Sequence, residues 1–342
     1  MATIRDVARL AGVGLGTASR AISGRGVVAA ETQLKVETAV RALNFHPSKI
    51  ARSLNSKSQS LIGVYFPTFE GTYFAPMLQA IETELREHGM HMVTATLSGS
   101  ALGTRRERTL KSLEFLIERQ CDGILLIDNY AEESDLKALR GRIAHLAFAN
   151  RVVRGMAMES FSINHEDAGR LAARALIERG HRHFAVMYSA RHSADVDARM
   201  RGFHLEAKAQ GMQPAREFLL EGLMTFAHAW DAAGVVAGLK QRDFTAIFCA
   251  NDVLAVATQS RLQTARVQVP QDMSVLGYDD AEIAAYTYPA ISTVRVPSKW
   301  IAVNACRHLL NRAFGLKLPV TRRFAPELIW RDSVKDLASA AA

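Results

Sequence analysis

From residue 61 onward, short apolar runs alternate with amphipathic segments of helical period, and this alternation limits the fold more than any other sequence feature. The apolar runs, which predict strands, are Leu61–Phe66, His91–Ala95, Gly123–Ile127, His145–Ala149, Phe161–Ile163, Phe184–Met187, Thr245–Ala250, Ser274–Tyr278 and Ser292–Val296. The segments that predict helices between them include Pro76–His88, Arg105–Arg119, Glu166–Arg179, Arg199–Gln210 and Asp252–Thr264. Such alternation is typical of parallel sheets covered by helices on both faces. So many strands predict two doubly wound subdomains, with a ligand site between them at the carboxyl ends of the strands.

The composition excludes several other classes of protein. The chain has 342 residues, 49% of them hydrophobic, and its longest strongly apolar stretch is Gly123–Ile127. That stretch is far shorter than the ~20 residues of a membrane helix, and the charges at Arg5 and Asp6 argue against a signal peptide. The three cysteines lie far apart, which predicts neither a disulfide framework nor a zinc site. We therefore expect a cytoplasmic protein without membrane contact, metal or cofactor.

The first 60 residues concentrate positive charge and carry a helical pattern of their own. They hold nine basic and three acidic side chains, so they supply +6 of the net charge of +8. Thr3 and Asp6 are placed to cap a short helix that Gly12 ends. A second helix is expected from Leu15 to Ser23, and a third from roughly Glu31 to Leu43. A solvated basic surface would explain the charge alone, but the pattern predicts a helix-turn-helix unit that meets a polyanion.

Residues 44–60 differ from what precedes them. Pro47 breaks the chain, and Ile50–Leu54 contains enough residues for about two helical turns. Lys57–Ser60 is typical of a polar linker. Because a helix of about eight residues is marginal in water, we expect this one to need a surface to fold against.

Several short motifs recur along the whole chain in a fixed order. In the basic segment they are Ile4–Val13, Thr17–Arg20, Asn44–Ser48 and Ala51–Leu54. In the rest of the chain they are Asp122–Ile124, Arg179–Arg182, Arg199–Phe203, Ala250–Asp252, Val275–Asp280 and Pro289–Val294. Together these motifs resemble the LacI/GalR family of bacterial transcriptional repressors. The resemblance implies a helix-turn-helix DNA-binding head, a hinge helix and a ligand-binding core like that of periplasmic sugar-binding proteins.

The resemblance also implies domain boundaries and an assembly. We expect the all-α head at residues 1–58, with the hinge helix at about 48–56, and the α/β core at 61–342. The N-subdomain is expected at about 61–160 and 293–320, and the C-subdomain at about 161–290 and 321–334. The family binds near-palindromic double-stranded operator DNA as a homodimer. The segment after Trp330 has no leucine heptads, so we expect a dimer rather than a tetramer.

Five residues of the head match DNA-contacting positions of the family. They are Leu15, Gly16, Thr17, Arg20 and Thr32. Arg20 can offer a fork of donors to guanine and Leu15 an apolar contact to a thymine methyl, although Leu15 could instead belong to the core of the head. Thr17 and Thr32 match positions that contact phosphate. Because Gly16 has no side chain, we expect few base-reading residues, with Arg20 dominant.

Six residues of the core match ligand-contacting positions of the family. They are Tyr73, Phe74, Asn150, Arg199, Asn251 and Asp279. The polar members hydrogen-bond hydroxyl groups well, and an aromatic side chain suits the apolar face of a sugar ring. Tyr73 and Phe74 could instead be core residues, and Arg199 a structural ion pair. The pattern favours a mono- or disaccharide that acts as an inducer, with a purine or another metabolite as corepressor the alternative.

An α/β enzyme with a basic head, for example a sugar-modifying one, is a hypothesis of a different class. It would need a catalytic motif, and the sequence contains no G-x-x-x-x-G-K-[ST], G-x-S-x-G or H-E-x-x-H. A pure sugar-binding module would not need the basic head. We therefore expect a DNA-binding regulator without enzymatic activity, associated with the nucleoid.

In the family the hinge helix lies in the minor groove of the operator. Leu54 matches the leucine that is wedged into the central base step, and Ala51 matches the small residue that permits close approach. Unstacking one step costs on the order of a few kcal/mol and allows a bent duplex with wider contacts. The alternative is that Leu54 anchors the linker to the core.

We predict that Leu54→Ala weakens operator binding by at least about tenfold, because the wedge is lost, and leaves ligand affinity nearly unchanged. Fluorescence anisotropy with operator DNA and calorimetry with ligand measure the two affinities. An equal loss of both would show that Leu54 acts through the core.

Overall fold

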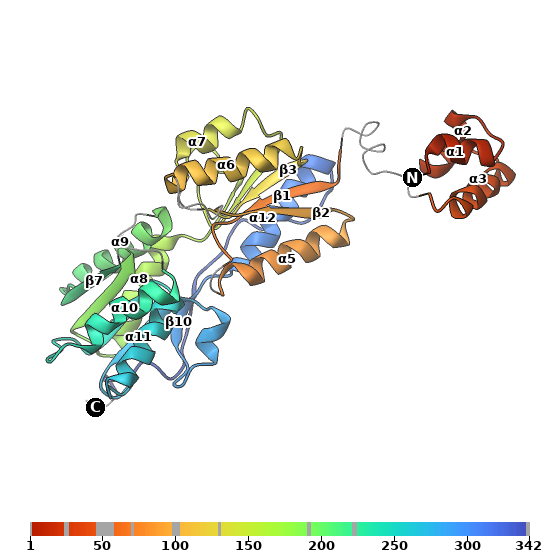
Figure 1. Cartoon of the computed structure of the whole chain (residues 1–342). Coiled ribbons are helices and arrows are strands. Elements are labelled where there is room, and N and C mark those ends of the chain that lie inside the picture. Colours follow the sequence, from red (N-terminus) through yellow and green to blue (C-terminus); the bar gives the residue numbers. More distant parts are fainter. Residues whose placement is uncertain are drawn as a thin grey trace. The chain divides into compact units, whose positions relative to one another are not determined.

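The computed structural model describes residues 2–23, 27–45, 58–69, 72–97, 103–128, 131–189, 193–220 and 224–339. The chain divides into two compact units, residues 1–59 and 60–342, called the head and the core below (Figure 1). The hinge helix expected at 48–56, with Ala51 and Leu54, lies outside the described residues. In the described part of the chain, no helix has both the length and the apolar character that a membrane span requires.

The described residues of the head form three short helices around a small apolar core. They are α1 (Ile4–Leu10), α2 (Leu15–Ser23) and α3 (Ala30–Ala42). The Thr3 hydroxyl accepts the backbone N–H of Asp6, and the Asp6 carboxylate accepts that of Thr3, so the predicted cap of α1 is present. Gly12, with φ +65°, makes the turn that leads toward α2. The buried side chains of Val7, Ala11, Ala21, Val36 and Ala39 pack together in this core.

The first sheet of the core is parallel and has the strand order β2-β1-β3-β4-β5. Its strands are β1 (Leu61–Tyr65), β2 (His91–Ala95), β3 (Gly123–Leu126), β4 (Leu146–Ala149) and β5 (Ser160–Phe161). Its helices are α5 (Phe74–Glu87), α6 (Arg105–Glu118), α7 (Glu133–Leu139) and α12 (Ser298–Phe314). Although α12 lies far along the chain, it packs beside α5 and against β3 and β4 (Figure 1).

Successive side chains of β3 show why its sequence is continuously apolar. Ile124 and Leu126 pack in one cluster with Leu113 of α6, whereas Leu125 packs in another cluster with Met77 of α5. Both faces of the strand are therefore buried, as expected for a parallel sheet between two helical layers.

The second sheet has the order β11-β10-β9-β8-β6-β7 and is parallel except for β11. Its strands are β6 (Phe184–Ser189), β7 (Arg216–Leu220), β8 (Ala246–Cys249), β9 (Ser274–Asp279), β10 (Ser292–Arg295) and β11 (Glu327–Ile329). Its helices are α8 (His165–Glu178), α9 (Ala194–Ala209), α10 (Phe226–Ala237), α11 (Asp252–Thr264) and the 3-10 helix η1 (Glu282–Ala285).

The boundary expected at residue 293 is wrong. β10 pairs with β9 from Ser292↔Leu276 to Arg295↔Asp279, so it belongs to the second sheet. The chain returns to the first subdomain only with α12 and comes back to the second sheet with β11. The apolar side chains of β10 are buried beside β9. The sequence predicted a strand here but did not show which sheet it joins.

Helices α8 and α9 approach each other closely through two glycines. A Cβ on Gly169 would collide with the carbonyl oxygen of Arg199, and a Cβ on Gly202 would collide with that of Glu166. Both obstacles are backbone atoms, which cannot rotate away. The close approach therefore fixes where α9 places the side chain of Arg199.

We predict that Gly169→Ala lowers the free energy of unfolding of the core by about 2 kcal/mol or more, because α8 and α9 must separate. Gly141→Ala is the matched control, because its Cβ would meet only the Ala138 carbonyl oxygen at 3.8 Å. Urea denaturation of both variants measures the difference. Equal stabilities would contradict the close packing.

Candidate functional site

A cavity of about 560 Å³ lies where the two sheets of the core direct their strand ends. All six residues that the sequence predicted as ligand contacts line it: Tyr73, Phe74, Asn150, Arg199, Asn251 and Asp279. The first three come from the first subdomain and the others from the second. The volume suits a small metabolite. Another hollow of about 600 Å³, near Arg266 and Pro289, contains none of these residues.

Arg199 is held in place by neighbours on several sides. It is 2% exposed, its guanidinium carbon lies 3.4 Å from the centroid of the Tyr278 ring, and one terminal nitrogen donates to the carbonyl oxygen of Ala250. Its other terminal nitrogen lies 3.8 Å from the Asp195 carboxylate. Within the described ranges, its buried Nε has no hydrogen-bond partner. Arg199 is thus both the member of an ion pair and part of the cavity wall.

Two of the polar lining residues have left-handed backbone conformations. Asn150 has φ +61° and Asp279 has φ +106°, and the next residue, Asp280, has φ +54°. Asn and Asp tolerate this region better than most residues, but it remains strained. Burial raises the pKa of Asp279 well above its usual value, and the nearby Arg199 opposes that rise.

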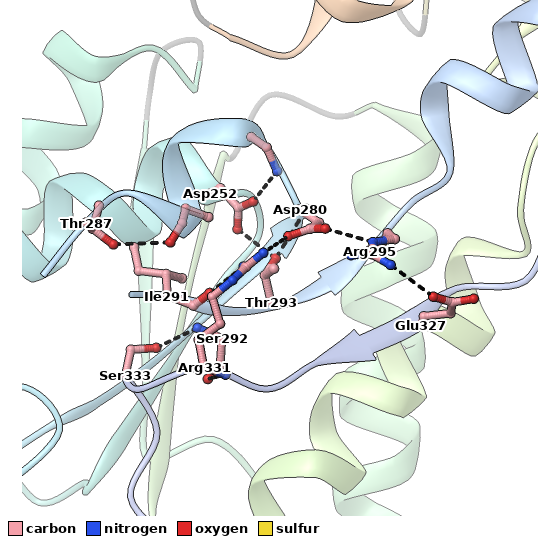
Figure 2. Close-up of polar contacts among 12 residues, drawn as sticks. Asp252, Asp280, Thr287, Ile291, Ser292, Thr293, Arg295, Glu327, Arg331 and Ser333 are labelled. Carbon is pink, nitrogen blue, oxygen red and sulfur yellow. Dashed lines mark hydrogen bonds and ion pairs between the residues drawn. The ribbon is translucent and has the colours of Figure 1, made fainter. Parts of the chain in front are cut away.

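A polar network holds the chain at the end of β9, as Figure 2 shows. The Asp280 carboxylate accepts from Arg295 at 2.7 Å and from Arg331 at 2.6 Å. The buried Asp252 carboxylate accepts the Thr293 hydroxyl and the backbone N–H of Ala281, both at 2.7 Å. Burial raises the pKa of Asp252 to about 7 despite these hydrogen bonds. The segment 279–281 is therefore held by Arg295 and Arg331 on one side and by Asp252 on the other.

The aromatic residues of the cavity are only partly core residues. Tyr73 and Phe74 pack against the main apolar cluster, with their ring centroids 5.1 Å apart, and both also line the cavity. For the buried Tyr73 hydroxyl and Asn150 Oδ1, no described residue supplies a hydrogen bond. A ligand could complete these hydrogen bonds, since buried polar atoms are rarely left without a partner.

Three charged residues that line the cavity were not predicted from the sequence: Arg105, Arg108 and Asp195. None of them belongs to a motif that carries the family resemblance. Arg105 begins the helix that follows β2, and Asp195 lies in the first turn of the helix that follows β6. That position, after the carboxyl end of a parallel strand, was the available signal.

On the head, α2 turns the predicted base-reading residues outward. Leu15 is 46% exposed, and Gly16 and Arg20 are also exposed, whereas Ala18 is buried. Leu15 is therefore not a core residue of the head. A Cβ on Gly16 would meet no atom within 4 Å, so packing within the head does not require a glycine there. Thr17 and Thr32 are half-buried.

Over the residues that the structure describes, no three His, Cys, Asp or Glu side chains gather as a metal ion would require.

Comparisons with known proteins assign the family. Residues 3–48 match "Bacterial regulatory proteins, lacI family", and residues 173–334 match "Periplasmic binding protein-like domain". The chain is 33% identical to the HTH-type transcriptional repressor PurR of Vibrio cholerae serotype O1 (strain M66-2), over 98% of this chain and 99% of that protein. The chain belongs to the lacI family of bacterial regulatory proteins, which confirms the resemblance and the predicted fold class.

Two solved structures extend this similarity. A transcriptional regulator of the LacI family from Burkholderia phymatum has a TM-score of 0.76 and 34% identity, covering 81% of this chain and 99% of that one. The transcriptional regulator CelR–cellobiose complex has a TM-score of 0.68 and 25% identity, covering 97% and 100%. The chain is thus a DNA-binding transcription regulator whose core contains a periplasmic binding protein-like domain.

The buried histidine His165 supports Tyr278, whose ring lies against Arg199. His165 Nδ1 lies 2.9 Å from the Tyr278 hydroxyl, and its Nε2 lies 3.3 Å from the Ser162 hydroxyl. Burial lowers the pKa of His165 from 6.5 to about 4; Asp195 opposes this change and Arg199 adds to it. The imidazole is therefore neutral in the folded protein at pH 7.

We predict that the free energy of unfolding falls as the pH decreases from 6.5 toward 4, because the unfolded His165 binds a proton that the folded one does not. His165→Gln should remove this contribution to the pH dependence of the free energy of unfolding, which is at most about 1.4 kcal/mol per pH unit. The exposed His183→Gln is the control and keeps the slope of the wild type. Urea denaturation at several pH values measures the free energy of unfolding of each variant. A pH dependence in His165→Gln equal to that of the wild type would refute the prediction.

Proposed function

We propose that this protein is a transcriptional repressor whose affinity for operator DNA is controlled by a small ligand in the cavity of the core. The observation that carries the proposal is the gathering of six predicted contact residues around one cavity, lined from both subdomains. A repressor role is supported by the relative named HTH-type transcriptional repressor PurR. The protein acts as a homodimer on a near-palindromic operator.

The exposed face of α2 reads the major groove in this proposal. Arg20 donates to a guanine and Leu15 contacts a thymine methyl, for which the exposure of both side chains is required. Thr17 and Thr32 contact phosphates and fix the register. Ala51 and Leu54, outside the described residues, act in the minor groove.

A ligand that touches both walls favours one relative arrangement of the subdomains. Asn150 and Tyr73 contact it from the first subdomain, and Asp279 and Asn251 contact it from the second. The ligand shifts the equilibrium by no more than its difference in affinity for the two arrangements. The change reaches the DNA through the hinge segment between the core and the head.

The ligand is a mono- or disaccharide that acts as an inducer. Carboxylate, amide and aromatic side chains around the cavity suit a sugar, and the similar CelR structure is a complex with cellobiose. A second candidate is a purine that acts as a corepressor, and the relatives named PurR favour it. Operator binding that is strengthened by ligand would select the second candidate.

The test is operator binding by the full-length protein with and without candidate sugars and purines, measured by fluorescence anisotropy at several salt concentrations. Affinity should fall steeply with salt, because several phosphates are neutralised. Arg20→Ala should reduce the free energy of operator binding by about 1–3 kcal/mol and relax the base preference at one operator position.

Arg41→Ala is the matched control for Arg20→Ala. Arg41 is an equally charged residue at the far end of α3, where it pairs with Glu37 at 3.8 Å. It should keep the base preference of the wild type. A protein that binds no duplex at low salt, with or without ligand, would rule out the proposed function.

A further inference from the structure

The first turn of α6 carries three arginines, two of which lie at one edge of the cavity. Thr104 and Glu107 form a capping box there, so the Glu107 carboxylate is engaged with the backbone. Arg106 points to other carboxylates, at 2.7 Å from Asp135 and 3.2 Å from Glu132. The two remaining arginines, Arg105 and Arg108, line the cavity.

Arg108 differs from Arg106 in its surroundings. No carboxylate of the described residues forms an ion pair with Arg108, and its buried Nε has no hydrogen-bond partner among them. A guanidinium is always charged and is costly to bury without a partner. Because Arg105 and Arg108 are three residues apart on one helix, their side chains share a face of α6.

Charged side chains of both signs line the cavity. Arg105 and Arg108 oppose the rise in the pKa of Tyr65, which burial and Asp128 produce. Asp279, Asp195 and Arg199 instead influence the pKa of Tyr73, which burial raises. Arg105 and Arg108 thus add two cations to the cavity wall from the first subdomain, whereas the second subdomain adds the Asp195 and Asp279 carboxylates and the Arg199 guanidinium.

A second feature also indicates a polar ligand in this cavity. Asn150 is only 5% exposed and lines the cavity, yet its Oδ1 accepts no hydrogen bond from the described residues. The buried hydroxyl of Tyr73 is in the same situation. A hydroxylated ligand would supply donors and acceptors to both.

We propose that the ligand of this protein is an acidic sugar, whose carboxylate or phosphate is held by Arg105 and Arg108 and whose hydroxyl groups face Asp279 and Asn251. The inference rests on the proposed function and deepens it. Paired guanidiniums are well suited to oxyanions, because each offers two parallel N–H donors. A neutral sugar or a purine base would leave the positive charge of Arg108 without a partner.

The experiment compares anionic sugars with their neutral parents on the full-length protein. Thermal shift and titration calorimetry use D-gluconate and D-glucose 6-phosphate against D-glucose, D-galacturonate against D-galactose, and D-ribose 5-phosphate against D-ribose, with adenine as a purine. At least one anionic member should bind tenfold or more tightly than its neutral parent. Carboxylates and phosphates are tested separately, so the result identifies which anion is recognised.

Three variants assign the effect to Arg108. Arg108→Gln should lower the affinity for the anionic ligand at least tenfold. Arg108→Lys keeps the charge but loses the paired N–H donors of the guanidinium, so it should lower the affinity less. Lys111→Gln removes an exposed charge from the same helix and should leave the affinity unchanged. Equal affinities in all three variants would overturn the role of Arg108.

The inference is overturned if only neutral sugars or adenine bind, or if no anionic sugar binds. Operator binding measured in parallel separates this failure from that of the proposed function. A protein that binds operator and responds only to a neutral ligand retains the proposed function. A protein that binds an acidic sugar through Arg108 but no operator retains only the ligand site.

Discussion

The ligand cavity depends on a buried carboxylate. Asp252 begins α11 inside the second subdomain, and its two oxygens hold Thr293 of β10 and the backbone of Ala281 (Figure 2). Its neighbour Asn251 lines the cavity, and residue 281 follows the strained pair Asp279 and Asp280. A buried carboxyl group requires such hydrogen-bond partners. The same hydrogen bonds that satisfy Asp252 therefore hold Asp279 in a backbone conformation that it would not adopt alone.

This polar network also joins the cavity to a segment that connects the subdomains. Asp280 binds Arg295, the last residue of β10, and Arg295 also contacts Glu327 of β11 at 3.3 Å. The chain leaves the second sheet after β10 and returns to it with β11. Asp280, which follows Asp279, therefore contacts Arg295, and Arg295 contacts Glu327, so the ligand site is linked to the places where the chain leaves and re-enters the second subdomain. Through these contacts a ligand at Asp279 can influence the movement of the subdomains.

Much of the fold follows from local pattern, and the missing parts have physical reasons. Strands such as β3 were predictable because both of their faces are buried. β7 was missed because it is an edge strand with mostly exposed side chains, and β11 because it has only three residues. In the site, Asn251 and Asp279 were predictable from family motifs and strand ends. Arg108 was not, because its importance comes from its having no ion pair among the described residues, which only the structure shows.

The central claim is that ligand in the core and DNA on the head are energetically coupled. The most direct measurement is the ligand dissociation constant of the full-length protein with and without saturating operator DNA. Linkage requires that DNA changes ligand affinity by the same factor by which ligand changes DNA affinity. We predict a factor of about 5–150 in each direction. A ligand dissociation constant that is identical with and without bound operator would contradict the claim.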